Sequence, residues 1–248
     1  LVTGCSKGLG KALVEELIAQ GYPVAGTSRS KESLEKSIGA ESDLFLPLSM
    51  NVKEEADVKK AIAQATEKFG RIDVVVNNAG FTHLATIEEM SDADAREEFD
   101  INVFGTLNVI RGALPQMRAQ GSGHIFNVSS LGAYNVGPLS GIYCATKHAV
   151  KAISETLAQE VKAFGIHVTD VKPGFMKTEF FGSSHKTTAP EGSPYKHLYD
   201  ENMKFYMGQN GNQAGDPKKA AKLYIKVAFR WEPTAVMASG ISAKEPSS

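Results

Sequence analysis

The stretch LVTGCSKGLG, residues 1–10, sets a short apolar segment directly against a glycine-rich turn. An amphipathic helix is predicted immediately after it, because apolar residues recur there every three or four positions. Glycine lets a backbone approach a pyrophosphate closely, and a helix N-terminus supplies N–H donors and a positive dipole end. The order strand, turn, helix therefore favours a dinucleotide site. Gly4, Gly8 and Gly10 depart from the usual G-x-G-x-x-G spacing, so an ordinary tight turn is the alternative.

Beyond this turn, short apolar runs alternate with longer segments of helical period, a pattern typical of a parallel sheet covered on both faces. The predicted strands are Leu1–Thr3, Pro23–Thr27, Leu44–Pro47, Ile72–Val76, Gly123–Val128 and Ile166–Val171. The predicted helices are Leu9–Gln20, Lys31–Ser37, Val52–Phe69, Asp92–Arg118, Ile142–Phe164 and Asp216–Trp231. We expect one doubly wound α/β domain over residues 1–248, with a long loop at Phe175–Gly215 that is a candidate substrate lid.

The composition excludes several classes of partner. A net charge of −1 gives no electrostatic reason to expect nucleic acid or an anionic membrane surface as a partner. No apolar run reaches the ~18 residues of a membrane span. Cys5 and Cys144 are too few for a disulfide framework and have no metal-ligand spacing, so we expect free thiols, no metal and a cytoplasmic location. Since the chain starts at Leu1, within a predicted strand, we expect further residues upstream in the natural protein.

The end of the second predicted strand bears on the choice of dinucleotide. An NAD site usually carries Asp or Glu there, bonded to the ribose 2′-hydroxyl. This chain has Ser28 and Arg29 instead, and Lys7 lies in the glycine turn. Two cations and no carboxylate suit a 2′-phosphate, which favours NADP(H). The alternative is that Arg29 and Lys7 are ordinary solvated charges.

Polar and small residues follow two further strands at the edge where doubly wound sheets place their sites. They are Asn78-Ala79-Gly80 after the fourth strand and Ser129-Ser130 after the fifth, although structural turns have a similar composition. Tyr143 and Lys147 lie four positions apart on a predicted helix and therefore share one face. Alone, this pair is also compatible with a surface position.

Taken together, these residues resemble the short-chain dehydrogenase/reductase family. The matching positions are Gly4/Gly8/Gly10, Asn78-Ala79-Gly80, Asn102, Ser130, Tyr143/Lys147 and Pro173-Gly174, in the family's order, over Leu1 to about Trp231. The resemblance implies a Rossmann fold with a parallel seven-stranded sheet, its last strand near Thr234–Ala238. It also implies an NADP(H)-preferring, carbonyl reductase-like enzyme.

The resemblance also implies a role for each matching residue. Tyr143 is the general acid in ketone reduction, and Lys147 lowers the pKa of its phenol and holds the nicotinamide ribose. Ser130 donates to the substrate carbonyl, and Asn102 shapes its helix and positions a water. The cofactor set is Gly4, Ser6, Lys7, Gly8, Leu9, Gly10, Arg29, Asn51, Val52, Asn78, Ala79, Gly80, Val128, Tyr143, Lys147, Pro173, Gly174, Met176 and Thr178. Asn51 departs from the family, which commonly has Asp beneath the adenine.

An apolar substrate pocket is expected from residues that follow the strand ends and from the lid. The candidates are Phe81, Ser130, Leu131, Tyr134, Val136, Phe180 and Phe181. Further aromatic and apolar residues in Phe175–Gly215 either join this pocket, pack the lid on itself or fill a subunit interface. Such a lining suits a lipophilic or aromatic carbonyl compound or alcohol.

The sequence thus predicts an NADP(H)-dependent oxidoreductase that transfers hydride between the nicotinamide and a ketone or secondary alcohol. The alternative is a protein that senses NADP(H) without turnover, and a lyase using the same serine and tyrosine is disfavoured because Lys147 and the glycine turn are both present. By resemblance, the helices from Asp92 and around Lys147 form the interface of a homodimer or homotetramer.

Overall fold

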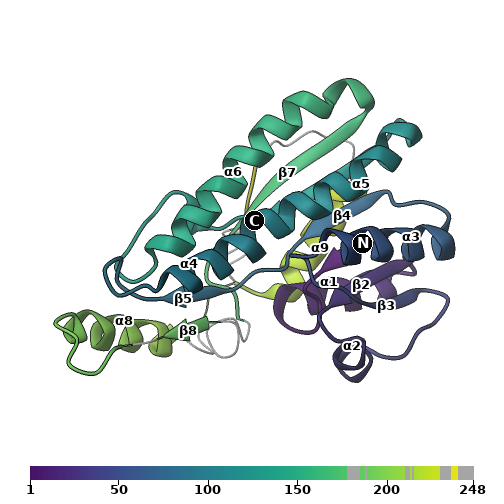
Figure 1. Cartoon of the computed structure of the whole chain (residues 1–248). Coiled ribbons are helices and arrows are strands. Elements are labelled where there is room, and N and C mark those ends of the chain that lie inside the picture. The colour runs from purple at the N-terminus through teal and green to yellow at the C-terminus, as the bar shows by residue number, and fades with distance from the viewer. Residues whose placement is uncertain (178–184, 188, 210–212, 214, 230–235, 240–248) are drawn as a thin grey trace, which may run out of the picture.

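The fold is a parallel sheet between two layers of helices, as the computed structural model shows for residues 1–177, 185–187, 189–209, 213, 215–229 and 236–239 (Figure 1). The sheet order is β3-β2-β1-β4-β6-β7-β9, and every pairing is parallel. The strands are β1 Val2–Thr3, β2 Val24–Ser28, β3 Phe45–Ser49, β4 Val74–Asn77, β6 Gly123–Val128, β7 Ile166–Pro173 and β9 Val236–Ser239. The order runs outward in both directions from β1 and β4, so their carboxyl ends form the switch point where such folds bind ligands.

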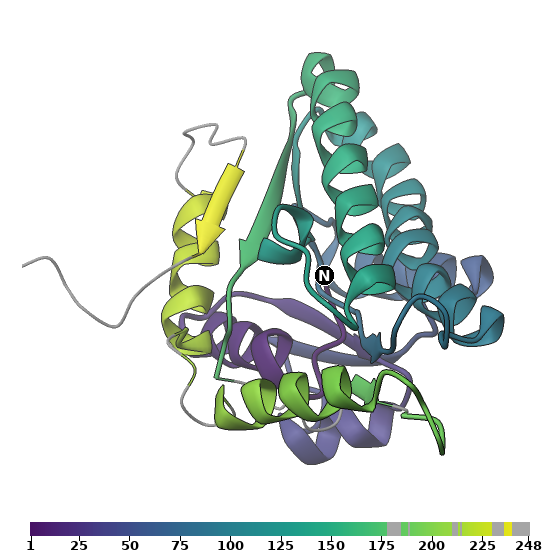
Figure 2. The ribbon, with the colours of Figure 1, turned by 90° about the vertical axis from the view of Figure 1, so that its left-hand side faces the viewer.

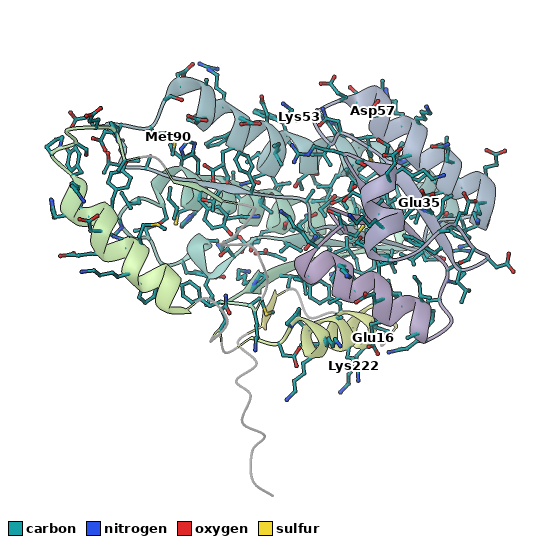
Figure 3. All side chains as sticks on the ribbon, turned by 90° about the horizontal axis from the view of Figure 1, so that it is seen from below. Glu16, Glu35, Lys53, Asp57, Met90 and Lys222 are labelled. Atoms are coloured by element: carbon teal, nitrogen blue, oxygen red, sulfur yellow. The ribbon has the colours of Figure 1, made fainter. Side chains whose placement is uncertain are left out.

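Helices cover both faces of this sheet, as Figure 2 shows in a view turned from Figure 1. The α-helices are α1 Gly8–Ala19, α2 Lys31–Ser37, α3 Glu55–Phe69, α4 Asp92–Phe99, α5 Thr106–Gln120, α6 Gly141–Val161, α8 Lys196–Gln209 and α9 Pro217–Phe229. Residues of α3, α5 and α6 share one buried apolar core with the sheet, and residues of α1, α2 and α9 share the other. Helices α1 and α9 lie side by side, with Lys222 pointing to solvent (Figure 3).

The predicted α/β fold class is confirmed, and most element boundaries differ from the expected ones by only one to three residues. Helix α3 packs through an apolar stripe, in which Val58, Ile62 and Ala65 are buried and Phe69 packs against the same core. Ser91 caps α4 by accepting a hydrogen bond from the N–H of Asp94.

The single helix predicted over Asp92–Arg118 is wrong in one respect. A π-helical segment, Asp100–Gly105, separates α4 from α5. The wider turn places the Asn102 side chain against the backbone of Phe81, with which it exchanges two hydrogen bonds. Close packing continues at Gly105, where a Cβ would lie 2.7 Å from Val52 Cγ2. Periodicity alone does not distinguish this widened turn from an α-helix.

The segment Phe175–Gly215, expected to be a loop, contains regular structure. Strand β8, His185–Thr187, pairs with β5, Thr82–Leu84, in a second, two-stranded parallel sheet. Helix α8 follows and passes below the main sheet near β5 (Figure 1). The sequence reading missed β5 and β8 because three-residue strands carry almost no periodic signal.

The ends of α5 and of the 3₁₀ turn after α6, Lys162–Phe164, offer a stability test. Gly121 and Gly165 terminate them with φ +65° and φ +68°, both in the left-handed region. A Cβ on Gly121 meets nothing within 4 Å, whereas one on Gly165 would lie 2.4 Å from the carbonyl oxygen of Gly121.

We expect Gly121→Ala to lower the free energy of unfolding by about 1 kcal/mol, from the left-handed conformation alone. We expect Gly165→Ala to lower it by about 2 to 4 kcal/mol, because the clash adds to that strain. Urea unfolding of both variants measures the difference. Equal losses would contradict the close packing of Gly165 against the Gly121 carbonyl group.

Candidate active site

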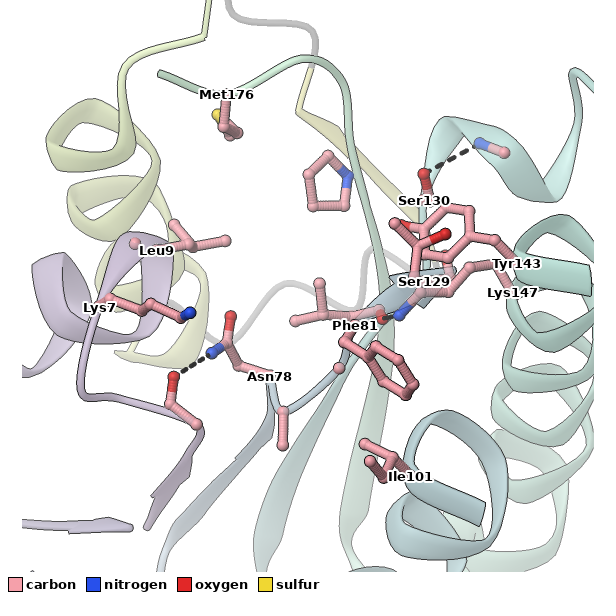
Figure 4. Close-up of a pocket in the computed structure, with 18 of the residues that line it drawn as sticks. Lys7, Leu9, Asn78, Phe81, Ile101, Ser129, Ser130, Tyr143, Lys147 and Met176 are labelled. Atoms are coloured by element: carbon pink, nitrogen blue, oxygen red, sulfur yellow. Dashed lines mark hydrogen bonds between the residues drawn. The ribbon is translucent and has the colours of Figure 1, made fainter. Parts of the chain in front are cut away.

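A cavity of about 750 Å³ opens at the carboxyl ends of the central strands. Its walls come from the glycine turn after β1, from the ends of β2, β4, β6 and β7, and from α6. Figure 4 shows Lys7, Leu9 and Asn78 at one end and Ser130, Tyr143 and Lys147 at the other. Most of the polar side chains predicted from the strand ends therefore border one continuous space.

The turn after β1 is locked to the end of β4. The Thr3 hydroxyl accepts hydrogen bonds from the N–H groups of Asn78 and Ala79, both at 3.0 Å. Asn78 Nδ2 in turn donates to the carbonyl oxygens of Thr3 and Gly4. Gly4 has φ +67°, and a Cβ there would lie 2.8 Å from Ala79 Cα. Two motifs more than 70 positions apart thus require each other.

Gly10 has a packing role and does not border the cavity. A Cβ at this position would lie 2.5 Å from Asn78 Nδ2 and 2.6 Å from the Gly4 carbonyl oxygen. The third glycine of the motif therefore lets α1 start close against the two loops. Gly4, Ser6, Lys7, Gly8 and Leu9, which belong to the predicted cofactor set, do line the cavity.

The amino end of α1 fits a diphosphate. Its N-cap, Lys7, makes no side-chain capping hydrogen bond, and no acidic residue lies in its first turn. The first N–H groups of the helix therefore lack a side-chain acceptor within the described residues and adjoin the cavity. Thr27, which also borders the cavity, has a buried hydroxyl with no hydrogen-bond partner in this described part of the chain.

The end of β2 forms a polar rim that the sequence reading identified only in part. Arg29 is exposed and borders the cavity, as do Ser28, Ser30 and Ser33. Ser28 Oγ donates to the Ser30 carbonyl oxygen at 2.6 Å, and Ser30 Oγ accepts from Ser33 N–H and so caps α2. The serines were missed because small hydroxyl residues after a strand indicate a turn as readily as a ligand site.

Asn51 and Val52 line the neighbouring part of the cavity, together with Met50. The Asn51 backbone N–H donates to Asp57, and Asn51 Oδ1 accepts from the N–H of Lys53. The helix predicted from Val52 begins at Glu55 because this local turn occupies the intervening residues. Asn51 thereby shapes the part of the cavity wall that follows β3.

Asn102 lies behind the cavity rather than in its wall. It is buried, and its Nδ2 donates to the Phe81 carbonyl oxygen at 2.9 Å and to Thr146 Oγ1 at 3.1 Å. Its Oδ1 accepts from the Phe81 N–H at 3.0 Å. Asn102 thus connects the β4–β5 loop to α6 through its hydrogen bonds to Phe81 and Thr146. Thr146 directly precedes Lys147 in α6.

Lys147 is almost fully buried beside Tyr143. Its Nζ donates to the Val128 carbonyl oxygen at 2.9 Å and lies 5.6 Å from the centre of the Tyr143 ring. Burial lowers the pKa of Lys147 to about 8, and the charges of Glu98 and Asp170 oppose part of that decrease. Lys147 is therefore a group whose charge can change near neutral pH.

Ser130 and Tyr143 converge beside Gly132, as Figure 4 shows for the two side chains. A Cβ on Gly132 would lie 3.4 Å from both Ser130 Oγ and Tyr143 Cε1. The Ser130 hydroxyl accepts from the Gly132 N–H at 3.0 Å, which fixes its orientation. A hydroxyl, a phenol and an ammonium group thus meet at one end of the cavity, as general acid–base chemistry requires.

The wall around this end is mainly apolar. Phe81, Leu131 and Val136 border it as predicted, and Pro173, Gly174 and Met176 border it from the end of β7. The sequence reading missed Leu84, Glu97, Ile101, Asn135 and Ser140, and Phe175 is one of the residues of Phe175–Gly215 that do join the cavity wall. Those on α4 and β5 gave no signal because only the tertiary structure turns these elements toward the site.

Tyr134 was wrongly assigned to the pocket. It is exposed and does not border the cavity. Its ring lies 5.4 Å from Lys151 Nζ and 5.3 Å from Lys172 Nζ. Cation–π contacts hold it over the α6 and β7 lysines instead. The predicted contacts Thr178, Phe180 and Phe181 lie outside the described residues.

Helix α8 is fastened to the segment between β5 and α4. The Tyr199 hydroxyl accepts from the Thr86 N–H at 3.2 Å and donates to Glu89 Oε2 at 2.9 Å, and Tyr195 donates to Glu88. Tyr199 is buried with Leu84 and Leu139 in a small apolar cluster. The cavity wall at β5 is therefore supported from below by α8.

Both cysteines are free and buried. Burial raises the pKa of the Cys5 thiol to about 12, which makes it unreactive. Among the residues that the structure describes, no His, Cys, Asp and Glu side chains cluster as metal ligands. In the same residues no helix is long and apolar enough to cross a membrane.

The model of the short chain dehydrogenase family matches residues 1–189. The chain belongs to this family. Oxidoreductase BOA17 of Botryotinia fuckeliana is 35% identical to it over 245 residues, which cover 98% of this chain and 89% of that protein.

Solved structures share the fold. The enzyme from Streptomyces avermitilis has a TM-score of 0.84 and 33% identity, with 96% of this chain and 88% of that one covered. ElxO, solved with NADP bound, has a TM-score of 0.77 and 25% identity, with 96% and 94% covered. This short-chain dehydrogenase is accordingly an oxidoreductase of carbonyl or alcohol groups that uses a nicotinamide cofactor.

The buried Lys147 predicts a pH dependence of stability. Its pKa is about 8 when folded and about 10.4 when unfolded, so the unfolded chain binds more protons between these values. The free energy of unfolding therefore gains a contribution from Lys147 as the pH rises through this window.

We expect the free energy of unfolding of the wild type, relative to Lys147→Met, to increase by roughly 2 to 3 kcal/mol between pH 8 and pH 10.5. Urea unfolding of both proteins across this range measures the difference, and the variant corrects for all groups that they share. A difference that stays constant with pH would show that Lys147 titrates normally.

Proposed function

We propose that the protein is an NADP(H)-dependent short-chain dehydrogenase that interconverts a lipophilic or aromatic ketone and its secondary alcohol. The observation that carries the proposal is the convergence of Ser130, Tyr143 and Lys147 at one end of a cavity whose other end is a glycine turn. Oriented proton donors lie at one end, and phosphate-compatible backbone lies at the other.

NADP(H) is the proposed cofactor because the rim at β2 is cationic and hydroxylated. Arg29, Lys7, Ser28, Ser30 and Ser33 all border the cavity there, and no carboxylate of the described residues does so at this end. Charge-assisted bonds from Arg to a phosphate suit the 2′-phosphate of NADP(H). ElxO, which was solved with NADP bound, supports the same choice.

The diphosphate is proposed to lie at the amino end of α1, and Asn78-Ala79-Gly80 to bound the ribose. Lys147 and Tyr143 would contact the nicotinamide ribose, with Pro173, Gly174 and Met176 beside the ring. When bound, the nicotinamide donates or accepts the hydride.

The proton is proposed to move at the Tyr143 hydroxyl. In ketone reduction Tyr143 donates it to the carbonyl oxygen, while the Ser130 hydroxyl donates a hydrogen bond to the same atom. Tyr143 becomes a phenolate when it donates the proton. The charged Lys147 stabilises this phenolate and so lowers the pKa of the phenol. Asn102 supports this arrangement by holding Phe81 and Thr146 on either side of it.

The proposed substrate is apolar around its carbonyl carbon. Phe81, Leu131, Val136, Phe175 and Ile101 surround the Ser130–Tyr143 end of the cavity. A pocket with a large apolar surface and a few fixed polar groups suits such compounds. The segment 175–215, with α8 fastened beneath β5, is proposed as the substrate lid.

Tyr143→Phe should lower kcat/KM for ketone reduction by roughly 10² to 10⁴-fold, because the proton donor is removed. The affinity for NADPH should stay within about twofold, since the ring remains. Steady-state NADPH absorbance and fluorescence titration measure the two quantities.

Tyr22→Phe is the matched control, since Tyr22 lies before β2, at the opposite end of the strands from the site. It should retain wild-type turnover. Full activity of Tyr143→Phe would exclude the proposed mechanism.

Arg29→Asp should move the preference from NADPH toward NADH. Loss of a charged hydrogen bond and gain of a repelling carboxylate change the ratio of the two kcat/KM values by roughly ten- to a hundredfold. Kinetics with both cofactors measure that ratio. Lys36→Asp, an exposed charge reversal on α2 away from the cavity, should leave the ratio unchanged. An unaltered ratio in Arg29→Asp would reject the role of Arg29.

The second candidate function is NADP(H) sensing without turnover. It is disfavoured because Ser130, Tyr143 and Lys147 are all present at one end of the cavity, beside an apolar wall. A panel of ketones and alcohols, followed by NADPH absorbance, separates the two functions. Cofactor binding with no turnover of any compound would support the sensor.

A further inference from the structure

A buried carboxylate stands next to the active site outside the expected catalytic set. Glu98 is on α4, one helical turn before Asn102, and its side chain is fully buried. Its Oε2 accepts a hydrogen bond from the His83 backbone N–H at 3.4 Å. Its Oε1 has no hydrogen-bond partner within the described residues. A buried carboxyl group with an unsatisfied oxygen is costly and calls for an explanation.

Three elements, β5, α4 and α6, contribute the polar and charged groups around Glu98. Strand β5 contributes His83 and Thr82, whose hydroxyl helps to lower the pKa of the carboxyl. Helix α4 contributes Asp94, whose Oδ1 lies 3.2 Å from His83 Nδ1. Helix α6 packs against α4, and a Cβ on Gly80 would lie 3.1 Å from Asn102 Oδ1 and 3.5 Å from Lys147 Nζ. Lys147 therefore lies beside the helical turn that follows Glu98, and it is the cation whose charge acts on Glu98.

Lys147 has a matching environment. The charge of Asp170 on β7, like that of Glu98, raises the pKa of Lys147, but Asp170 already forms a buried ion pair with Lys172. Tyr143 is on the same helix, and the backbone contact of Lys147 is a neutral carbonyl group. Glu98 is therefore the nearby anion that has no other cation paired with it among the described residues.

We infer that Glu98 is a positioning residue of the active site, which acts through Lys147 by keeping its ammonium group charged at neutral pH. It touches neither the cavity nor the reacting atoms. Its effect on turnover rests on the proposed function, but its effect on the charge of Lys147 does not.

The two groups titrate close together. Burial raises the pKa of Glu98 to about 7 and lowers that of Lys147 to about 8. As the pH rises through about 7, Glu98 ionises and favours the charged Lys147, and as the pH falls through the same range Glu98 becomes neutral and this stabilisation is lost. Glutamine therefore imitates the protonated Glu98, so the effect of Glu98→Gln depends on pH.

The first test measures the charge of Lys147 directly. NMR of protein labelled with ¹³C at lysine Cε, with Lys147→Met for assignment, gives its titration curve without turnover. In Glu98→Gln the pKa of Lys147 should fall by roughly one unit. An unchanged pKa would overturn the inference.

The second test is the pH profile of kcat/KM for ketone reduction. With a shift of about one unit, Glu98→Gln should be about fivefold slower than the wild type at pH 8 and nearly equal to it at pH 6. Glu98→Asp, which keeps the charge, should restore much of the rate at pH 8. A loss of equal size at every pH would indicate a purely structural role and reject the inference.

Asp92→Asn is the matched control. It removes one carboxylate from the same helix, but Asp92 is exposed and paired with Arg96. Asp92→Asn should leave the decrease of kcat/KM at alkaline pH at the same pH as in the wild type. A shift of the pH profile as large as that of Glu98→Gln would mean that the effect comes from the net charge of the protein and not from Glu98 itself.

The coupling is reciprocal, which gives a measurement that remains available if Glu98→Gln does not fold. In Lys147→Met the pKa of Glu98, followed by ¹³C at glutamate Cδ, should rise above its wild-type value. No rise would reject the coupling. If the wild type reduces no ketone while both NMR shifts occur, the proposed function fails and the charge coupling stands.

Discussion

The contact between the Gly4 turn and the Asn78–Ala79 segment is the constraint on which the rest of the site depends. Thr3 accepts two backbone hydrogen bonds from that segment, and the Asn78 amide returns two to the turn. Only a glycine leaves room for this approach at a positive φ. Because β1 and β4 are the strands where the sheet order reverses, the lock joins the two halves of the cavity and sets where α1 begins.

A second constraint is electrostatic. Three buried ionisable groups, Lys147, Glu98 and Asp170, lie on three different elements around the end of the cavity. Burial disfavours the charge on Lys147 and on Glu98, and the attraction of Lys147 to the two carboxylates partly restores its charge. The π-helical turn contributes to this arrangement, since it brings Asn102 to Phe81 and Thr146 while the preceding turn presents Glu98 to β5. The resulting site is both rigid and sensitive to pH.

The parallel sheet and the edge that carries the site could be predicted from the sequence alone. The alternation of apolar runs and helical segments indicated the parallel sheet, and the polar residues after β1, β4 and β6 indicated its active edge. The failures are physically informative. Tyr134 follows a strand end, as true cavity residues do, but two lysines from α6 and β7 draw its ring outward. Strands β5 and β8 are too short for a periodic signal, and Glu98 reads as one more acid in an acidic helix.

By itself, the sequence determined the fold class, the family and the residues that can exchange a proton or approach a phosphate, because these depend on local chemistry and on order along the chain. Tertiary structure alone decided which of them share one space. It placed Asn102 and Gly10 behind the wall and brought Ser28, Ser30, Glu97 and Phe175 into it. It also buried Glu98 within the influence of Lys147. The reason is that burial and the distance between charges arise from the packing of elements far apart in sequence, and no local pattern encodes either quantity.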